Sequence, residues 1–305
     1  MSFWEVFLQQ LFNGLLVGSF YGLVAIGYSM VYGIIKLLNF AHADIYMSGA
    51  FVGMVVLGFF ANTFVGNAWL GIAVSLVITM FLVGMLGVFI QRVAYRPMLK
   101  APRLSILITA LAVSMILYNI VLLLTGGQVR AFRTGLTGES FFIGTLRLTE
   151  TRVVLLIAAF LLMFILHQFI TRTMYGKAMR AIALDRDTCQ LMGINVFKII
   201  AVTFFVGSSL AAAAGIMAGV YYGSAHYFMG FLIGLKAFTA AVIGGIGIIP
   251  GAMLGGLLLG LLESFAIQLP FIGTVWKDVF SFVFLILFLI FKPNGILGRI
   301  ESERM

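Results

Sequence analysis

The sequence predicts an all-α membrane protein with about eight to ten transmembrane helices, some of them short or broken. Three observations support this prediction. Hydrophobic residues make up 62% of the chain and charged residues only 10%, whereas soluble domains contain roughly 45–50% and about 25%. The apolar residues gather in separate runs. The linkers between these runs are too short to form a soluble domain, so we expect residues 1–305 to be a single transmembrane domain.

The apolar runs have the length of membrane-spanning helices. A spanning helix needs about 20 apolar residues, and lipid offers no hydrogen-bond partner to a backbone that is not helical. We therefore expect a helix at each run, and the last run, which is short, should extend back through Val279 and Trp276. The runs lie at residues 9–33, 45–61, 68–90, 104–125, 153–170, 199–222, 231–249, 252–269 and 279–291.

The first run is expected to be a retained helix. No basic residue precedes it, whereas a cleavable signal peptide begins with positive charge. Cys189 is the single cysteine, so no internal disulfide can form, and a free thiol fits a position that faces the cytosol.

Basic residues are unevenly divided between alternate loops, and this predicts the orientation. Thirteen of the 19 Lys and Arg residues fall in one set of loops and five in the other, while Lys236 lies within a run. The side rich in basic residues is normally cytoplasmic. We expect the C-terminus and residues 171–198 in the cytosol, and the N-terminus and the 126–152 loop on the periplasmic side. The net charge of +9 then reflects topology, and no nucleic-acid partner is expected.

The glycines include two regular ladders with a spacing of four residues. Such ladders let helix backbones approach closely in lipid. We interpret them as packing faces, with a role in lining a path as the alternative. The ladders are Gly14, Gly18 and Gly22, and Gly247, Gly251 and Gly255.

Polar residues stand at the start of the second run. Asn39, His42 and Asp44 occur within LNFAHADIYMSGAF, although a charge at the bilayer centre costs roughly 2.5–3.5 kcal/mol. In one interpretation Asn39 caps a helix, and the Asp44 carboxylate interacts favourably with the positive N-terminal end of the helix dipole. In the other, the three residues form a gate or a helix contact beside a transport path. His42 taken alone fits a hydrogen-bonded packing residue better.

A break is predicted between the seventh and eighth runs. Proline interrupts helices and glycine admits left-handed backbone. Lys236 and Glu263 lie at similar distances before and after the break, so two antiparallel helices would bring them to one depth. We expect them to pair, because lone charges in the membrane are disfavoured; the alternative is that each extends separately to the interface. The break contains Gly244, Gly245, Gly247, Pro250 and Gly251.

Residues 171–198 concentrate charge within this apolar chain. Apolar and charged residues alternate there at helical spacing, which predicts one or two short amphipathic helices at the membrane surface, and Gly193 followed by Asn195 suits a helix end. A solvated loop is the alternative, but a simple connector needs only a few residues, so we favour a docking element. Its candidate contact residues are Gly176, Lys177, Arg180, Asp185, Arg186, Asp187, Gly193 and Asn195.

The sequence contains no recognisable catalytic or metal-binding pattern. It lacks the phosphate-binding pattern GxxxxGK[ST], the HExxH pattern and paired cysteines. His42, His167 and His226 lie far apart in the sequence. We therefore expect no catalytic residue, no metal and no cofactor in this chain, and no ATP hydrolysis by the chain alone.

Five motifs in order resemble the permease subunits of branched-chain amino acid ABC transporters. They are LNFAHADIYMSGAF, QRVAYRPM, GKAMRAIALDRDTCQLMGIN, GLKAFTAAVIGGIGIIPGAMLGG and KPNGILGR. The resemblance implies the ABC importer permease fold in a bacterial inner membrane and import of branched-chain or other neutral amino acids. It also implies a second related permease, a periplasmic binding protein, and two cytoplasmic ATPases that bind ATP and Mg.

The chain departs from the general patterns at two places. The coupling loop of ABC permeases has Glu-Ala-Ala, three residues and then Gly, whereas here Asp187, Thr188 and Cys189 precede Gly193, and the later Ile-x-Leu-Pro is missing. What the resemblance implies is therefore the location of a short docking helix, not its contacts. Ala43 stands where the family usually has glycine, and its methyl group could narrow a close helix approach.

Other classes of transporter remain open from the sequence. An ion-coupled secondary transporter could use Asp44, Lys236 and Glu263, and broken helices also occur in such proteins. A channel is less well supported, because Asn-Phe-Ala occurs only once. A permease of the same family for urea or amides is equally compatible with these motifs, and a membrane enzyme has the least support.

Overall fold

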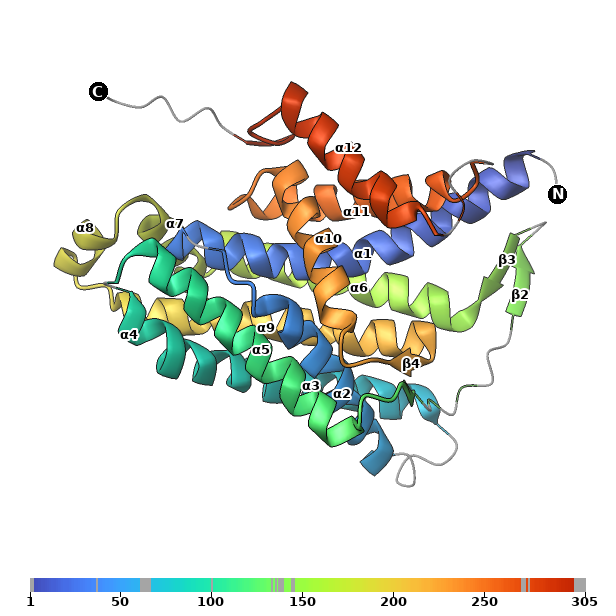
Figure 1. Cartoon of the computed structure of the whole chain (residues 1–305), viewed down its shortest axis with the longest axis horizontal. Coiled ribbons are helices and arrows are strands. Elements are labelled where there is room, and N and C mark those ends of the chain that lie inside the picture. The colour runs from blue at the N-terminus through green and yellow to red at the C-terminus, as the bar shows by residue number, and fades with distance from the viewer. Residues whose placement is uncertain are drawn as a thin grey trace.

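In the computed structural model each apolar run forms a helix (Figure 1). The structure describes residues 3–36, 38–60, 67–99, 101–132, 134, 136, 140–143, 146–269, 273 and 275–298. The long helices are α1 (Phe3–Ile35), α2 (His42–Phe60), α3 (Ala68–Ile90), α5 (Arg103–Thr125), α6 (Glu150–Arg172), α9 (Val196–Tyr222), α10 (Met229–Gly244), α11 (Ile249–Ala266) and α12 (Lys277–Phe291).

The described part contains seven helices that are long and apolar enough to cross a membrane. Two further apolar helices are shorter: α10 has 16 residues and α12 has 15. This agrees with the expected all-α membrane fold with some short helices. Smaller elements connect the long helices: η1 (Gln91–Tyr95, a π-helical turn), α4 (Arg96–Met98), α7 (Met174–Leu184) and α8 (Arg186–Leu191).

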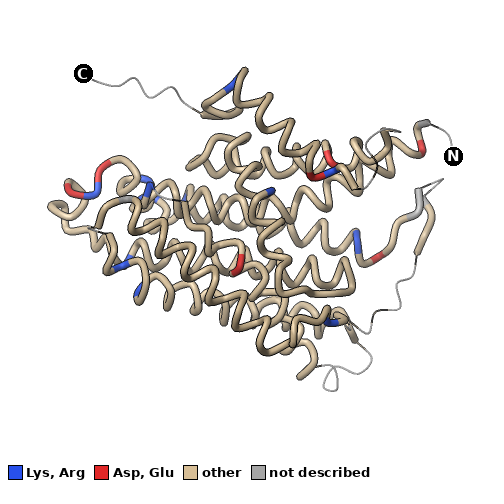
Figure 2. The backbone as a smooth tube through the Cα atoms, viewed as in Figure 1, with Lys and Arg blue, Asp and Glu red and all other residues tan. Residues whose placement is uncertain are grey.

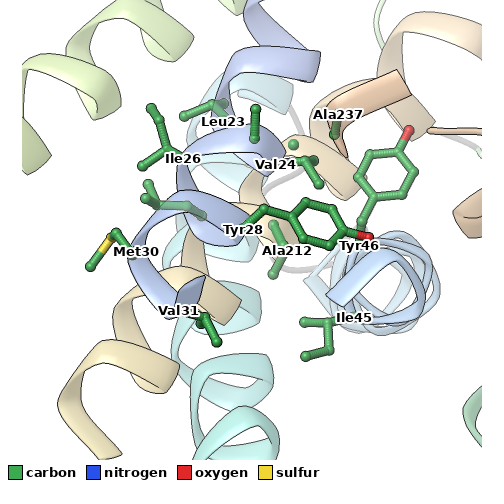
Figure 3. Close-up of a cluster of buried hydrophobic side chains, with 14 of the residues drawn as sticks. Leu23, Val24, Ile26, Tyr28, Met30, Val31, Ile45, Tyr46, Ala212 and Ala237 are labelled. Carbon is green, nitrogen blue, oxygen red and sulfur yellow. The ribbon is translucent and has the colours of Figure 1, made fainter. Parts of the chain in front are cut away.

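Helix α1 is the central helix of the bundle. Of its apolar window 89% is buried, against 17% for α5, so α1 is enclosed by protein and α5 borders the surroundings. Figure 3 shows side chains of α1, among them Leu23, Ile26 and Tyr28, gathered with Tyr46 of α2 and Ala212 of α9. A helix that is apolar on all sides is expected in such a position.

The glycine ladder of α1 packs against α11. A Cβ atom added to Gly18 would lie 2.8 Å from the carbonyl oxygen of Gly256, and one added to Gly14 would lie 2.8 Å from the Cα of Leu261. Conversely, a side chain on Gly260 would meet the backbone of Gly18. The predicted packing role of this ladder is therefore confirmed, with Gly256 and Gly260 as its partners.

We expect Gly18→Leu to lower the thermal stability of the protein in detergent. The new side chain overlaps the backbone of α11, and overpacking typically costs about 1–3 kcal/mol or more. Gly58→Leu is the matched control, because a Cβ atom on Gly58 meets nothing within 4 Å. Equal melting temperatures for the two variants would contradict the close α1–α11 contact.

The loops form two separate ends of the bundle. The strands β2 (Ser140–Ile143) and β3 (Leu146–Thr149) pair antiparallel near the start of α1, whereas α7 and α8 lie at the opposite end (Figure 1). Figure 2 shows charged residues gathered mainly at these ends, with few between them. This separation of the 126–152 loop from residues 171–198 fits the expected topology. The cytosolic assignment of the α7–α8 end stays a prediction.

A second short strand pair joins the two loops expected on the periplasmic side. The strand β1 (Arg130–Ala131) pairs antiparallel with β4 (Ser224–Ala225), and Arg130 lies opposite Ala225. The amide of Phe132 also donates to the carbonyl of Gly223. The loop after α5 and the loop after α9 therefore form one surface.

Candidate functional site

The polar residues at the start of α2 are buried within protein. The Tyr95 hydroxyl donates to the Asn39 side-chain oxygen over 2.5 Å, and the Ser114 hydroxyl donates to Asp44 Oδ2 over 2.5 Å. Asn39, His42 and Asp44 are all buried. The hydrogen bonds of Asn39 and Asp44 connect the start of α2 to η1 and α5. A role of these residues as a gate or contact beside a transport path stays a prediction.

The alternative interpretation of Asn39 as a helix cap has less support. Its side-chain oxygen is taken by Tyr95, and the amides of His42 and Asp44 donate to the backbone carbonyls of Asn39 and Ala41. Asp44 does lie in the first turn of α2, where a carboxylate interacts favourably with the helix dipole.

His42 packs between helices. Its ring meets the edge of the Tyr28 ring at a centroid distance of 5.0 Å, and it fills the space beside Gly27 and Gly207. Its Nε2 atom and the side-chain nitrogen of Asn39 have no hydrogen-bond partner among the described residues. The sequence predicted that His42 is a hydrogen-bonded packing residue. The packing agrees with this prediction, but its Nε2 atom makes no hydrogen bond to the described residues.

Ala43 is accommodated by glycines of α10. A Cβ atom added to Gly234 would lie only 2.2 Å from the Ala43 methyl carbon, and one added to Gly230 would lie 2.6 Å from the Ala43 carbonyl oxygen. The extra methyl group therefore fits without separating α2 from α10.

Lys236 and Glu263 form the predicted ion pair. The Lys236 ammonium lies 2.5 Å from Glu263 Oε1, and both residues are only 4% exposed. Neither side chain extends to the surface. The pair thus joins α10 to α11 inside the bundle, on the two sides of the helix break.

Three further residues complete a polar network around this pair. Lys236 also contacts Asp278 Oδ1 of α12 at 2.6 Å. The Tyr21 hydroxyl donates to Glu263 Oε2 over 2.7 Å, and the Ser281 hydroxyl donates to Glu263 Oε1 over 3.1 Å. The buried-charge network, as we call these five residues, connects α1, α10, α11 and α12; the Asp278 side chain is 33% exposed and the other four residues are buried.

Sequence reasoning missed Asp278, Tyr21 and Ser281. Asp278 offered a usable signal, because it is a carboxylate at the start of an apolar run. A cation within the membrane, such as Lys236, requires a carboxylate partner of this kind. Tyr21 and Ser281 are ordinary residues within apolar helices and gave no such signal.

The break between α10 and α11 is confirmed. Helix α10 ends at Gly244 and α11 begins at Ile249, with Pro250 in its first turn. Gly245 and Gly247 have φ values of +103° and +88°, which favour glycine. A side chain on Gly244 would collide with the backbone of Gly251. Glycine is therefore required here both for the turn and for the close return of the chain.

The chain near its C-terminal end binds this break. The amide of Ile296 donates to the carbonyl of Ile243 over 2.8 Å, and the amide of Leu297 donates to that of Gly244 over 3.2 Å. These bonds satisfy carbonyls at the end of α10 that have no partner within the helix. Residues 292–298, the described part of the KPNGILGR motif, thus cap the break, a contact that the sequence did not predict.

The charged segment forms two short helices, as expected. Thr173 caps α7 by accepting from the Gly176 amide over 3.2 Å, and Asp185 caps α8 by accepting from the amides of Asp187 and Thr188. The hydrogen bonds from the Thr188 hydroxyl and amide lower the pKa of the Asp185 carboxyl below its usual range. The segment is thus a defined pair of helices.

Helix α8 ends just before Gly193, as the sequence predicted. Gly193 adopts a φ of +81°, and Asn195 then caps α9 by accepting from the Lys198 amide over 3.0 Å. These two candidate residues therefore set the turn between α8 and α9.

Three candidate residues hold α7 and α8 on the bundle. Arg186 donates to the Ile34 carbonyl at the end of α1, with a distance of 3.0 Å from Nε, and its partial burial lowers the pKa of its guanidinium. Arg180 donates to the Ile170 carbonyl of α6, and Gly176 packs on the backbone of the same residue. Lys177 and Asp187, by contrast, are exposed.

The outer side of this segment is apolar as well as charged. Leu184, Leu191 and Met192 are 90%, 88% and 77% exposed, whereas Met179, Ile182 and Cys189 face the bundle and are buried. We call these three exposed residues the apolar tip. Sequence reasoning concentrated on the charges and missed them; the leucines at the ends of two short helices were the available signal.

A cleft lies beside the apolar tip. It has a volume of about 390 Å³ and is formed by residues from α1, α5, α7, α8 and the segments that follow α1 and α4. It is lined by Ile35, Lys36, Leu99, Ala101, Ile106, Leu184, Asp185 and Arg186. An exposed apolar surface such as the apolar tip, next to a cleft lined by both apolar and charged residues, is the kind of surface that a protein partner covers.

Comparisons with known proteins agree with this architecture. Residues 10–289 match the family described as branched-chain amino acid transport system / permease component. The chain is 42% identical over 304 residues to the high-affinity branched-chain amino acid transport system permease protein LivH of Salmonella typhimurium, with 98% of each chain covered. It is 44% identical over 303 residues to the corresponding protein BraD of Pseudomonas aeruginosa, again with 98% of each covered.

A solved structure shares the fold. It is an ABC transporter assigned to the metal-chelate type, in an inward-facing conformation, and it aligns with a TM-score of 0.52 at 18% identity. The alignment covers 93% of this chain and 84% of that chain. At this identity the likeness concerns the arrangement of the helices alone.

Proposed function

This chain belongs to the branched-chain amino acid transport system permease family, and from that premise we propose that it is one permease subunit of an ATP-driven importer. It forms the membrane path with a second related permease in the bacterial inner membrane. Two cytoplasmic ATPases bind ATP and Mg, and a periplasmic binding protein delivers the substrate. The substrate is a branched-chain or other neutral amino acid.

The apolar tip is the observation that supports this function most strongly. Leu184, Leu191 and Met192 are exposed on a segment that is too charged to lie in the membrane core. Their exposure is costly in water and is relieved when a partner covers them. A short, capped and rigidly held pair of helices suits a groove on an ATPase. We assign the ATPase contact to the apolar tip together with exposed Lys177 and Asp187.

The geometry also suggests how motion of the ATPases reaches the membrane. When ATP binding closes the ATPases, they push on α7 and α8. Arg186 is bonded to the last turn of α1 through Ile34, and Arg180 to α6 through Ile170. Because α1 is the central helix, a displacement of α8 is passed to the core, and the permease pair switches between inward-facing and outward-facing states.

The start of α2 is the best candidate for the wall of the path. Asn39, His42 and Asp44 are polar groups at the beginning of a helix within the bundle, and Asp44 is joined to α5 by Ser114. Helix α5 is also the least enclosed span, so it is suited to face a second permease. Few charges line this region, which fits a solute without net charge.

The buried-charge network argues against the secondary transporter. Lys236 and Glu263 are held by each other and by Asp278, Tyr21 and Ser281. Charges that are fully engaged with each other serve helix packing better than ion coupling, which requires a site that exchanges an ion. Of the three residues proposed for ion coupling, only Asp44 remains outside this network.

Uptake by the reconstituted transporter tests the proposal. We expect liposomes with both permeases, the ATPases and the cognate binding protein to transport radiolabelled leucine when ATP is present on the side of the membrane where the ATPases lie. An ion gradient without ATP should give no uptake. Uptake driven by the gradient in the absence of the ATPases would contradict the proposal, and uptake of urea but not leucine would overturn the assigned substrate class.

A further inference from the structure

An apolar groove opens on a different face of the bundle, between α3, α6 and α9. It has a volume of about 290 Å³. Phe81 and Ile165 on its walls are more than half exposed, so the groove is open to the surroundings. The only hydroxyl on its walls, that of Ser209, donates to the Met80 carbonyl. The groove is lined by Met80, Phe81, Leu162, Ile165, Leu166, Phe169, Phe205, Val206, Ser209 and Leu210.

Each wall of the groove continues to a basic residue at the α7–α8 end of the bundle. On α6, Ile165, Phe169 and Arg172 follow one another at spacings of four and three, so they share a face. Arg172 then stands about 4.5 Å beyond Phe169 along the helix axis at 1.5 Å per residue. The aromatic wall and the guanidinium are therefore neighbours on the same stripe.

The other two walls repeat this arrangement. On α9, Lys198 lies seven residues before Phe205 and eleven before Ser209, which again places it on their face. On α3, Arg92 follows Phe81 by eleven residues, at the point where α3 passes into η1. Three separate helices thus bring a basic residue to the same end of one apolar groove.

These cations are available for a ligand. Arg92, Arg172 and Lys198 are exposed, and within the described residues their side chains form no hydrogen bond or salt bridge. Arg96 adds a fourth positive charge nearby, held over the Phe197 ring at 4.8 Å. Of the acidic residues closest in sequence, Asp187 belongs to α8, and Asp185 precedes this helix and is engaged as its cap.

We propose that this groove binds an anionic phospholipid, with one acyl chain against Phe81, Ile165 and Phe205 and the phosphate between Arg92, Arg172 and Lys198. Basic pockets between transmembrane helices on the cytoplasmic side bind anionic head groups. Charge complementarity selects such a lipid over a zwitterionic one, because only the anionic lipid offers net negative charge to three cations. The assignment does not depend on which solute the transporter carries.

Native mass spectrometry of the delipidated, intact transporter tests the site. Phosphatidylglycerol and phosphatidylcholine of equal chain length are added, and retained lipids are counted. We expect retention of phosphatidylglycerol only. Each basic residue near the surface contributes a factor of roughly five to binding, so Arg172→Gln/Lys198→Gln should weaken retention by about 30-fold. Arg130→Gln, which removes a charge from β1, is the control and should retain the lipid as the unchanged transporter does.

A second variant keeps the charges and fills the groove. Ile165→Trp should abolish retention although Arg92, Arg172 and Lys198 are intact. Undiminished retention of phosphatidylglycerol in the double variant or in Ile165→Trp would overturn the proposal, as would equal retention of both lipids by the unchanged transporter. A disulfide cross-link between Ile165→Cys and the second permease would also overturn it, because the groove would then be a protein interface.

Discussion

Lys236→Met is expected to destabilise the permease more than any other single substitution proposed above. The variant leaves Glu263 and Asp278 close together and without the cation between them. Removal of one partner from a buried ion pair costs about 3–5 kcal/mol, which is a large part of the roughly 5–15 kcal/mol by which proteins are stable. We expect a clear loss of folded protein by fluorescence-detected gel filtration and a lower melting temperature in detergent.

Two further variants separate the network from a general effect of mutation. Lys177→Met removes a lysine that is exposed on α7 and should leave the melting temperature unchanged. Lys236→Met/Glu263→Gln should recover part of the loss, because a neutral pair is tolerated better than a lone buried carboxylate. If the Lys236→Met protein has the same melting temperature as the unchanged protein, the network contributes nothing to the stability of the fold.

Leu191→Asp/Met192→Asp is expected to detach the ATPases while the permease stays folded in the membrane. Central apolar contacts of an interface contribute about 2 kcal/mol or more each, so the double variant should weaken ATPase binding by roughly 700-fold or more. Both side chains are highly exposed in the isolated chain, so their replacement should not disturb the bundle. Co-purification of the ATPases with a tagged permease measures the effect.

A control substitution makes the same chemical change elsewhere. Val275 precedes α12 and is 87% exposed, so Val275→Asp places a carboxylate on an equally open apolar residue outside α7 and α8. We expect this variant to bind the ATPases normally. If Leu191→Asp/Met192→Asp also retains them at the level of the control, the apolar tip is not the ATPase contact.

The sequence was sufficient where a single stretch of chain decides the structure. Apolar runs must be helical in lipid, and this sets the extent of the helices that the structure describes at these runs. The break needed only local information, since Gly245 and Gly247 occupy backbone conformations that favour glycine. The caps provided by Asp185 and Asn195 are local in the same way.

Lys236 and Glu263 were an intermediate case. They are 27 residues apart, yet the break between them implies antiparallel helices, and the penalty for a lone charge in the membrane then predicts a pair. The same reasoning could not identify Tyr21, which is 242 residues from Glu263 in the sequence. That contact depends on how α1 packs against α11, and nothing local determines it.

The remaining features required the tertiary structure for a similar reason. The cap that Ile296 and Leu297 provide for α10 joins segments separated by two helices. The apolar tip is defined by which face of α7 and α8 the bundle leaves open, and Leu184 and Ile182 differ in exposure although they are two residues apart. Periodicity indicated that one face is buried but not which leucines stay outside.

Chemical labelling of the apolar tip tests most directly whether α7 and α8 face the ATPases. Leu191→Cys is introduced with Cys189→Ala, so that the new thiol is the single one in the chain. A membrane-impermeant maleimide should label it in inside-out vesicles and not in right-side-out vesicles, and added ATPases should block the reaction. Labelling from the periplasmic face, or labelling that saturating ATPases leave unchanged, would contradict the proposed function of this segment.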